Sequence, residues 1–251
     1  MLLMNRFVLI FFFAIFASSL QLSAQRKVTF LTSDKLEITA DLYLYDSGAP
    51  YIILLHQENS SRGEYREIAP RLTKMGFNCL AIDMRSGKES NFVQNETAAL
   101  AQKSDLPTTL LDCEKDIIAA ITYVGNTSIN HRCILFGSCF SASLAMKVAN
   151  QNRRVTAVIA TSPGEYFIPL TVKDWLNDFN KLIFVTSTKH EQPFVTELIS
   201  SISPELITRY QSAEGGRQGA PALWNDSPQA NEIWMSLMMF IHKVRKERYY
   251  M

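Results

Sequence analysis

Two segments near the start of the chain alternate apolar and polar residues. The segments "KVTFLT" at 27–32 and "KLEITADLYLY" at 35–45 place apolar residues at roughly every second position, with a polar turn between them. A period of two is typical of strands that have one buried and one exposed face. The pattern therefore predicts a half-buried antiparallel pair of strands over residues 27–45.

After Pro50 the pattern changes to continuous apolar runs that alternate with segments of helical periodicity. Strands that are apolar on both faces are typical of parallel sheets covered by helices. The sequence therefore predicts an α/β fold with a mostly parallel twisted sheet of about eight strands, helices on both faces and no large lid. Six further strands are expected at 51–56, 78–84, 133–137, 155–162, 181–187 and 205–211, and helices at 64–76, 108–124, 141–151, 168–179, 193–202 and 228–247.

The segment 86–107 follows neither period and is expected to be a long irregular loop over the strand ends. A chain of 251 residues with 47% hydrophobic content can bury one substantial core. We therefore expect a signal segment at 1–24 and a single domain over 25–251.

The first residues have the order that is typical of a secretory signal peptide. Arg6 precedes an apolar stretch from Phe7 to Ala17, and small and polar residues follow up to Ser23 and Ala24. The sequence thus predicts export, to the periplasm or the exterior, after cleavage near Ala24. An uncleaved segment is the alternative, and it would be the only attachment to a membrane.

Charge and short motifs narrow the function classes. The 25 basic and 24 acidic residues nearly cancel, and no long basic run indicates a nucleic-acid partner. The sequence has no C-x-x-C pair, no H-E-x-x-H and no phosphate-binding loop, so it implies no metal and no cofactor. It does not indicate an oligomeric state.

Three of the four cysteines lie in apolar or helical segments. Cys79 and Cys133 belong to expected strands and Cys113 to an expected helix, so each is interpreted as a small buried hydrophobic residue. A disulfide between Cys113 and Cys133 stays open, because export would place the chain in an oxidising compartment. Only Cys139 lies in a turn.

That turn, "FGSCFSA", joins an expected strand directly to an expected helix. It resembles the nucleophile elbow of the α/β-hydrolase superfamily, G-x-S-x-G, and the G-x-C-x-G form of the dienelactone hydrolases. Gly137, Cys139 and Ser141 stand at the first, nucleophile and last positions. Ser141 replaces the usual glycine by another small residue.

The resemblance extends beyond the elbow. The segment "LLHQENSSRGEYREIAPRLTKMGFNCLAIDMRSGKES" resembles the early part of the family, with His56-Gln57 after the first parallel strand and 83–86 after the next. The similar order of strands and loops covers about residues 27–242. The resemblance implies an α/β-hydrolase fold and acyl-transfer chemistry.

In that family the elbow residue attacks the substrate, and backbone N–H groups stabilise the oxyanion. Carried over, the resemblance makes Cys139 the nucleophile and the N–H groups of Gln57 and Phe140 the donors. A position at a helix N-terminus leads us to expect that the thiolate of Cys139 is favoured.

The expected base is missing. The last loop, "EGGRQGAPALW", has Gln218 where the family has its histidine, and glutamine takes up no proton near neutral pH. The loop "STKHEQP" occupies the place of the family's acidic residue. Glu191 is one candidate for that role, and His190 is another residue that could reach Cys139 directly as a dyad. Glu165, after the preceding strand, is a second candidate acid.

Two functions follow from these residues. The first is a weak hydrolase of small esters, thioesters or lactones that acts through Cys139 on an ester-like small molecule. The alternative is a catalytically inactive member of the fold, retained for binding a ligand or a partner. A redox role of the Cys139 thiol is a third, weaker hypothesis.

Overall fold

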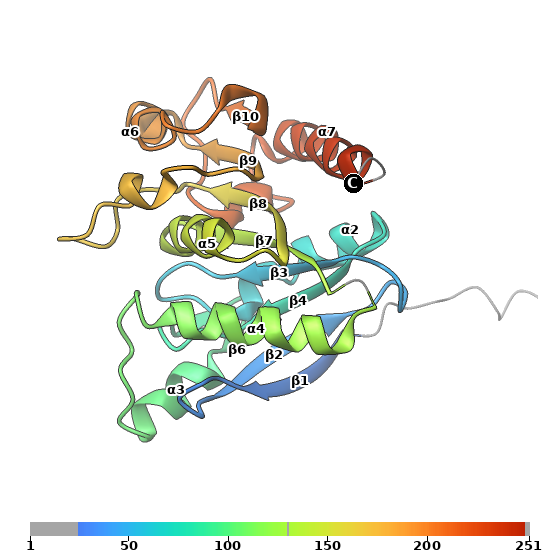
Figure 1. Cartoon of the computed structure of the whole chain (residues 1–251), viewed down its shortest axis with the longest axis vertical. Coiled ribbons are helices and arrows are strands. Elements are labelled where there is room, and N and C mark those ends of the chain that lie inside the picture. The colour runs from blue at the N-terminus through green and yellow to red at the C-terminus, as the bar shows by residue number, and fades with distance from the viewer. Residues whose placement is uncertain (1–24, 130, 249–251) are drawn as a thin grey trace, which may run out of the picture.

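The computed structural model describes residues 25–129 and 131–248, so the expected signal segment at 1–24 lies outside the described residues. It contains one eight-stranded sheet with the order β1-β2-β4-β3-β7-β8-β9-β10 (Figure 1). β1 and β2 form the expected antiparallel pair, β2 is also antiparallel to β4, and all other neighbours are parallel. The strands are β1 (Gln25–Leu31), β2 (Glu37–Tyr43), β3 (Tyr51–Leu55), β4 (Asn78–Ile82), β7 (Cys133–Ser138), β8 (Val155–Thr161), β9 (Leu182–Ser187) and β10 (Ile207–Gln211).

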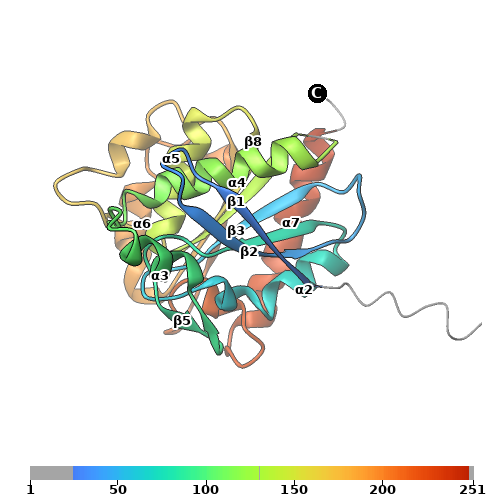
Figure 2. The ribbon, with the colours of Figure 1, turned by 90° about the horizontal axis from the view of Figure 1, so that it is seen from below.

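Helices cover both faces of this sheet, as expected (Figure 2). Alternate residues of each inner strand enter different cores: in β3, Ile53 and Leu55 belong to one, and Ile52 and Leu54 to the other. The first core packs against α4, α5 and α6, and the second against α2 and α7. The bounds are α2 (Ile68–Lys74), α4 (Cys113–Thr127), α5 (Phe140–Gln151), α6 (Gln192–Leu198) and α7 (Ala230–Arg248).

The segment 86–107 is more regular than the sequence suggested. It contains a small hairpin of β5 (Glu89–Ser90) and β6 (Val93–Gln94), followed by α3 (Glu96–Lys103). The side chain of Asn95 accepts a hydrogen bond from the Ala98 N–H at 2.8 Å, which is a typical helix N-cap. The run "ETAALAQK" after this asparagine is rich in helix-forming residues, so the signal was present in the sequence.

The helix expected at 168–179 does not form as such. The structure has a loop with a cis peptide bond between Ile168 and Pro169, and then a short 3-10 helix, Lys173–Leu176. Pro169 has no N–H to donate, and the Glu165 carboxylate accepts the N–H groups of Val172 and Lys173. Helical structure therefore begins only after this cap.

All four cysteines are free and buried, so no disulfide joins Cys113 to Cys133. Cys79 and Cys133 face the interior from β4 and β7, and Cys113 begins α4. The interpretation of these three residues as small hydrophobic side chains is confirmed. No helix in the described ranges is long and apolar enough to cross a membrane.

Two buried arginines fix the loops that follow β3 and β4. Arg62 pairs with Asp41 and Asp83, and Arg85 pairs with Asp116 and Asp34. Removing one partner from such a buried pair leaves an uncompensated charge, so these loops are held firmly. The loop after β3 carries the segment from His56 to Tyr65, which begins beside the carboxyl end of β7, because Leu55 pairs with Gly137.

Candidate active site

Cys139 lies at a sharp turn between β7 and α5. Its backbone has φ 55° and ψ −119°, a conformation that a residue with a Cβ adopts only under strain. Gly137 makes the turn possible, because a Cβ there would lie 2.4 Å from the carbonyl oxygen of Ser141 and 2.5 Å from the nitrogen of Ala142. The small residues of the motif therefore serve close packing of helix on strand.

Ser141 does more than replace a glycine. Its hydroxyl donates to the carbonyl of Leu55 at 2.7 Å and accepts from the N–H of Ser138 at 2.9 Å. Leu55 ends β3, and the next residues form the predicted oxyanion loop. The side chain thus ties the elbow to that loop, which glycine could not do.

The thiol of Cys139 is almost covered. The residue Cys139 is 7% exposed, and its thiol donates to the side-chain oxygen of Gln57 at 3.3 Å. Burial, together with the negative charges of Glu64 and Glu191, raises the pKa of the Cys139 thiol to about 12. The expectation that the helix N-terminus would favour the thiolate is therefore wrong, because desolvation and two nearby carboxylates outweigh the helix dipole.

A cavity of about 200 Å³ opens in front of the sulfur. It is lined by Gln57, Glu58, Asn59, Cys139, Phe140, Tyr166 and Gln218. Four of these residues, Gln57, Cys139, Phe140 and Gln218, are ones that the sequence predicts for the site. Tyr166 lines the cavity as well; its hydroxyl donates to the carbonyl of Ser162 at 3.1 Å, which holds its ring at the cavity wall.

The two N–H groups predicted to stabilise the oxyanion differ in whether they are already hydrogen-bonded. Phe140 begins α5, and the first N–H groups of a helix have no partner within the helix, so this donor is available. The N–H of Gln57, in contrast, donates to a carboxylate oxygen of Glu64 at 3.0 Å. The expectation for Gln57 therefore needs correction, because its N–H is occupied by an internal acceptor.

Glu64 is a buried carboxylate beside the candidate site that the sequence did not reveal. Its side chain is fully buried, and one carboxylate oxygen has no hydrogen-bond partner among the described residues. Burial raises the pKa of Glu64 to about 6, with Ser138, the Gln57 N–H and Ser60 acting in the opposite direction. In the sequence Glu64 was the first residue of an expected helix, where a glutamate is ordinarily exposed.

Glu191, one of the candidate acids, is held by four hydrogen bonds. Its carboxylate accepts from Ser162 Oγ at 2.8 Å, from the Thr188 N–H and hydroxyl at 2.9 Å, and from Gln218 Nε2 at 2.6 Å. The bond from the Thr188 N–H is part of the capping box of the 3-10 helix Lys189–Glu191, and the hydroxyls of Thr188 and Ser162 help to hold the carboxylate in one orientation. Gln218 is the remaining partner, and it connects Glu191 to the cavity.

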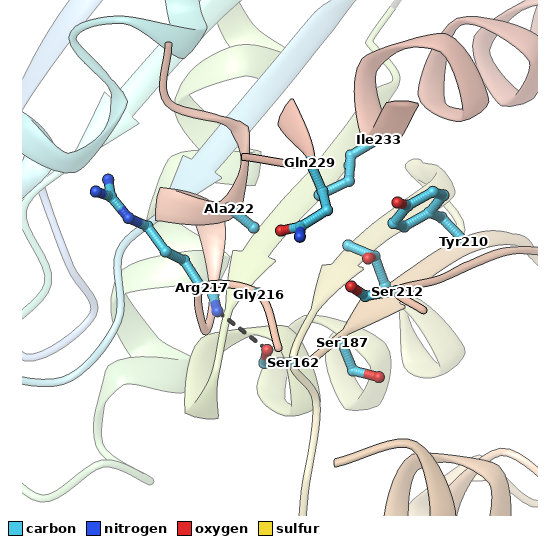
Figure 3. A pocket seen from close by; sticks show the side chains of 11 residues that line it. Ser162, Ser187, Tyr210, Ser212, Gly216, Arg217, Ala222, Gln229 and Ile233 are labelled. Carbon is cyan, nitrogen blue, oxygen red and sulfur yellow. Dashed lines mark hydrogen bonds between the residues drawn. The ribbon is translucent and has the colours of Figure 1, made fainter. Parts of the chain in front are cut away.

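Gly219 follows Gln218 and is also required by the geometry. Its φ is +71°, and a Cβ there would lie 2.4 Å from Ser138 Oγ and 3.1 Å from Cys139 Sγ. The N–H of Gly219 donates to Ser162 Oγ at 3.0 Å, the dashed line in Figure 3. Ser162 therefore links the Glu191 carboxylate to the backbone that passes the thiol. The sequence "GGRQGAP" indicated a turn here but not this close approach.

The other sequence candidates lie elsewhere. His190 is exposed on the short helix Lys189–Glu191 and is not among the residues that line the cavity. Glu165 is exposed too, and its carboxylate caps the 3-10 helix Lys173–Leu176. The structure therefore does not bring either residue to Cys139.

His56, the histidine nearest in sequence to the oxyanion loop, has a structural role. One ring nitrogen accepts from the Met84 N–H at 2.9 Å and the other donates to the Gln57 carbonyl at 2.7 Å. Burial lowers the pKa of His56 to about 4, so the ring stays neutral and fully bonded. It provides no base for the thiol.

Comparison with known proteins gives a consistent result. The model of the dienelactone hydrolase family matches residues 41–208, about two thirds of the chain. None of the curated proteins matches in a sequence comparison.

Several solved structures share the fold. An esterase from Pyrococcus furiosus superposes with a TM-score of 0.64 at 17% identity, over 88% of this chain and 92% of that chain. A dienelactone hydrolase from Anabaena variabilis has a TM-score of 0.63 at 14% identity, over 87% and 97%. The esterase domain of a Rhodothermus marinus protein has a TM-score of 0.59 at 12% identity, over 88% and 98%. At these identities the structural similarity establishes the α/β-hydrolase fold alone.

Proposed function

Because the chain belongs to the dienelactone hydrolase family, we propose that it is a slow hydrolase of small esters, thioesters or lactones, with Cys139 as its nucleophile. One observation carries the proposal. Cys139 sits at the strained elbow, faces a cavity of about 200 Å³ and is flanked there by Gln218, which is bonded to Glu191 at 2.6 Å. Cys139, Gln218 and Glu191 thus correspond to the nucleophile, the base and the acid of a catalytic triad, with glutamine at the position of the base.

The chemistry runs in two steps. The Cys139 sulfur attacks the carbonyl carbon, the bond from carbon to the alcohol oxygen or thiol sulfur breaks, and the leaving group departs with a proton from solvent. A thioester on Cys139 remains. Water then attacks the same carbon, the bond from carbon to sulfur breaks, and the carboxylic acid and the free thiol are formed.

The rate of the first step follows the fraction of thiolate. Gln218 cannot accept the thiol proton, so deprotonation relies on solvent. With a pKa of about 12 the thiolate fraction at pH 8 is about one in ten thousand. General-base assistance contributes about 10² to 10⁴ in rate, and its loss makes the enzyme weak and its activity steeply dependent on pH.

The oxyanion receives less support than in a complete site. Phe140 N–H points from the first turn of α5, whereas Gln57 N–H is bonded to Glu64. One donor of this kind contributes about 10² to 10³ in kcat. Activated esters and thioesters are therefore the expected substrates, because they need less stabilisation of the tetrahedral intermediate.

Hydrolysis of p-nitrophenyl acetate between pH 7 and 10 tests the proposal. We expect slow turnover that increases about tenfold for each pH unit and is abolished in Cys139→Ala. Cys133→Ala removes a thiol from the opposite end of β7 and serves as the matched control. Turnover that persists in Cys139→Ala would refute the mechanism, and absence of turnover at every pH would favour the inactive alternative.

Restoring the histidine gives an independent test of the site. In Gln218→His the imidazole would stand between Glu191 and Cys139, and we expect turnover at pH 8 to increase by about 10². The matched control is Gln192→His, which lies near the same loop, because Gln192 donates to Ser212, but does not line the cavity. An equal effect of both substitutions would refute the assignment of Gln218 to the position of the base.

We also propose that the protein is exported, which rests on the segment 1–24. Cleavage after Ala24 would leave β1 intact, since every residue of Gln25–Leu31 pairs with β2. The test is the N-terminal sequence of protein recovered outside the cytoplasm. A start at Gln25 supports the proposal, and intact protein that stays in the cytoplasm would overturn it.

A further inference from the structure

A second cavity, of about 340 Å³, lies beside the Cys139 cavity. Its walls come from two loops: the one before α4, with Leu110 and Leu111, and the one after β8, from Tyr166 to Leu170. The volume falls in the range of about 300 to 1,000 Å³ that is usual for small-molecule sites.

The lining of this second cavity is apolar, and its rim is exposed. Ile168 is 87% exposed, Leu170 45% and Leu111 38%. Large aliphatic side chains that are exposed together around a hollow are unusual on a soluble protein and indicate a binding surface. Thr109 is the one lining residue that is neither apolar nor aromatic.

The two cavities adjoin at two aromatic side chains. Tyr166 lines both of them. Phe167, in the second cavity, packs edge-to-face on Phe140, in the first, with ring centroids 6.4 Å apart. A molecule whose reacting carbonyl is at Cys139 can therefore extend along Tyr166 into the apolar space.

The charges of both linings restrict what that molecule can be. Neither cavity is lined by lysine or arginine, and the single charged lining residue is Glu58 beside Cys139. An anionic group would have no cation to pair with and would meet a carboxylate. A charge of either sign would also be costly against the apolar walls of the second cavity, so the part of the occupant that lies there is neutral and aliphatic.

We propose that the cavity formed by Leu110, Leu111, Tyr166, Ile168 and Leu170 binds the aliphatic arm of a neutral ester or thioester. This inference rests on the proposed hydrolysis at Cys139 for the position of the carbonyl. The arm is either the acyl chain or the alkyl chain of the leaving group, and the two substrate series described next distinguish these.

The first experiment measures kcat/KM along two series of substrates. One series runs from p-nitrophenyl acetate to the octanoate, and the other from S-ethyl to S-octyl thioacetate. We expect kcat/KM to increase about threefold to fourfold per methylene that leaves water, in one of the two series. A terminal carboxylate on the arm should abolish the gain. Flat dependence in both series would overturn the inference and leave hydrolysis at Cys139 standing.

Substitutions at the rim localise the effect. Ile168→Asp and Leu111→Asp each place a charge at an exposed position, so folding is not at risk. Each substitution should reduce kcat/KM for the longest preferred substrate about tenfold or more. The loss for the acetate should be much smaller than the loss for the long substrate, because the acetyl group is too short to extend into this cavity. Ile129→Asp is the matched control, since Ile129 is 72% exposed and lines neither cavity. Equal loss for short and long substrates would refute a role of the rim in chain binding.

A binding measurement separates this inference from the proposed function. Calorimetric titration of 1-octanol into the full-length protein should show binding that Ile168→Asp and Leu111→Asp weaken and Ile129→Asp does not. If no ester is turned over but 1-octanol binds in this pattern, the hydrolase proposal fails and the cavity assignment stands. If 1-octanol does not bind while esters are turned over, the cavity assignment fails.

Discussion

Replacing Glu64 by glutamine tests why the thiol of Cys139 stays protonated. The substitution keeps an acceptor oxygen for the Gln57 N–H, which Glu64 Oε2 now accepts at 3.0 Å. It removes the buried negative charge that, after desolvation, contributes most to raising the pKa of Cys139. Shape and hydrogen bonding are thus nearly unchanged while the electrostatic field at the sulfur changes.

The magnitude follows from the pKa of the thiol. An ordinary thiol of pKa 9.0 is about 10% thiolate at pH 8, whereas at a pKa of about 12 the fraction is about 0.01%. We therefore expect Cys139 to react with iodoacetamide about a thousandfold more slowly than a free thiol at pH 8. Glu64→Gln should recover about tenfold of this, because one pKa unit corresponds to a tenfold change in thiolate, and burial remains.

The assay follows alkylation of the Cys139 peptide by mass spectrometry between pH 7 and 10. Cys79, Cys113 and Cys133 serve as internal controls, because all three are buried and react only when the protein unfolds. Glu67→Gln is the matched control, since Glu67 is exposed and the same charge is lost. A rate that reaches a plateau below pH 8, or that does not change in Glu64→Gln, would refute the reasoning.

Two further predictions concern the backbone and the acid side of the pH range. Gly219→Ala should abolish turnover and lower Tm, because the new Cβ would lie 2.4 Å from Ser138 Oγ at a φ of +71°, whereas Gly215→Ala, with open space around its Cβ, should be neutral. The pKa of His56 is about 4 in the folded protein and 6.5 in the unfolded chain. The contribution of neutral His56 to the free energy of unfolding is therefore complete above pH 6.5, and about 3 kcal/mol of it is lost as the pH falls toward 4. Urea unfolding of wild type and His56→Asn measures this; equal pH dependence of the two proteins would contradict it.

The fold could be predicted because each inner strand is a continuous apolar run that can be recognised from its own residues. The runs "YIILL" and "CILFG" are apolar at every position, and the structure buries every residue of β3 and β7. The failure at 168–179 has a local cause that periodicity does not detect: Glu165, outside the expected helix, caps a later start at Lys173. Apolar spacing reports burial, whereas the start of a helix depends on single capping contacts.

The candidate site was less predictable because its decisive contacts are long-range. Cys139 and Gln218 could be placed from a motif and from loop order. Glu64 could not, since its neighbours come from distant parts of the chain: the indole N–H of Trp224, 160 residues further along, donates to the Glu64 carbonyl. The loss of Gln57 as an oxyanion donor depends on the same carboxylate. A sequence shows which groups are available, but not which of them are already bonded to each other.

The buried carboxylate of Glu64 should also reduce the stability of the protein, which makes its presence informative. Its folded pKa of about 6 lies above the ordinary 4.5, so the folded state binds the proton more tightly and loses stability as the pH rises from 4.5 through 6. At pH 7.5 the loss amounts to about 2 kcal/mol, and Glu64→Gln should recover most of it in urea unfolding, while below pH 4.5 the two proteins should be equally stable. Glu64 thus lowers the stability of the fold and reduces the thiolate fraction of Cys139. Its presence beside Cys139 is therefore not explained by a contribution to packing. If wild type proves more stable than Glu64→Gln at pH 7.5, the carboxylate is a structural anchor of the oxyanion loop, and this argument is wrong.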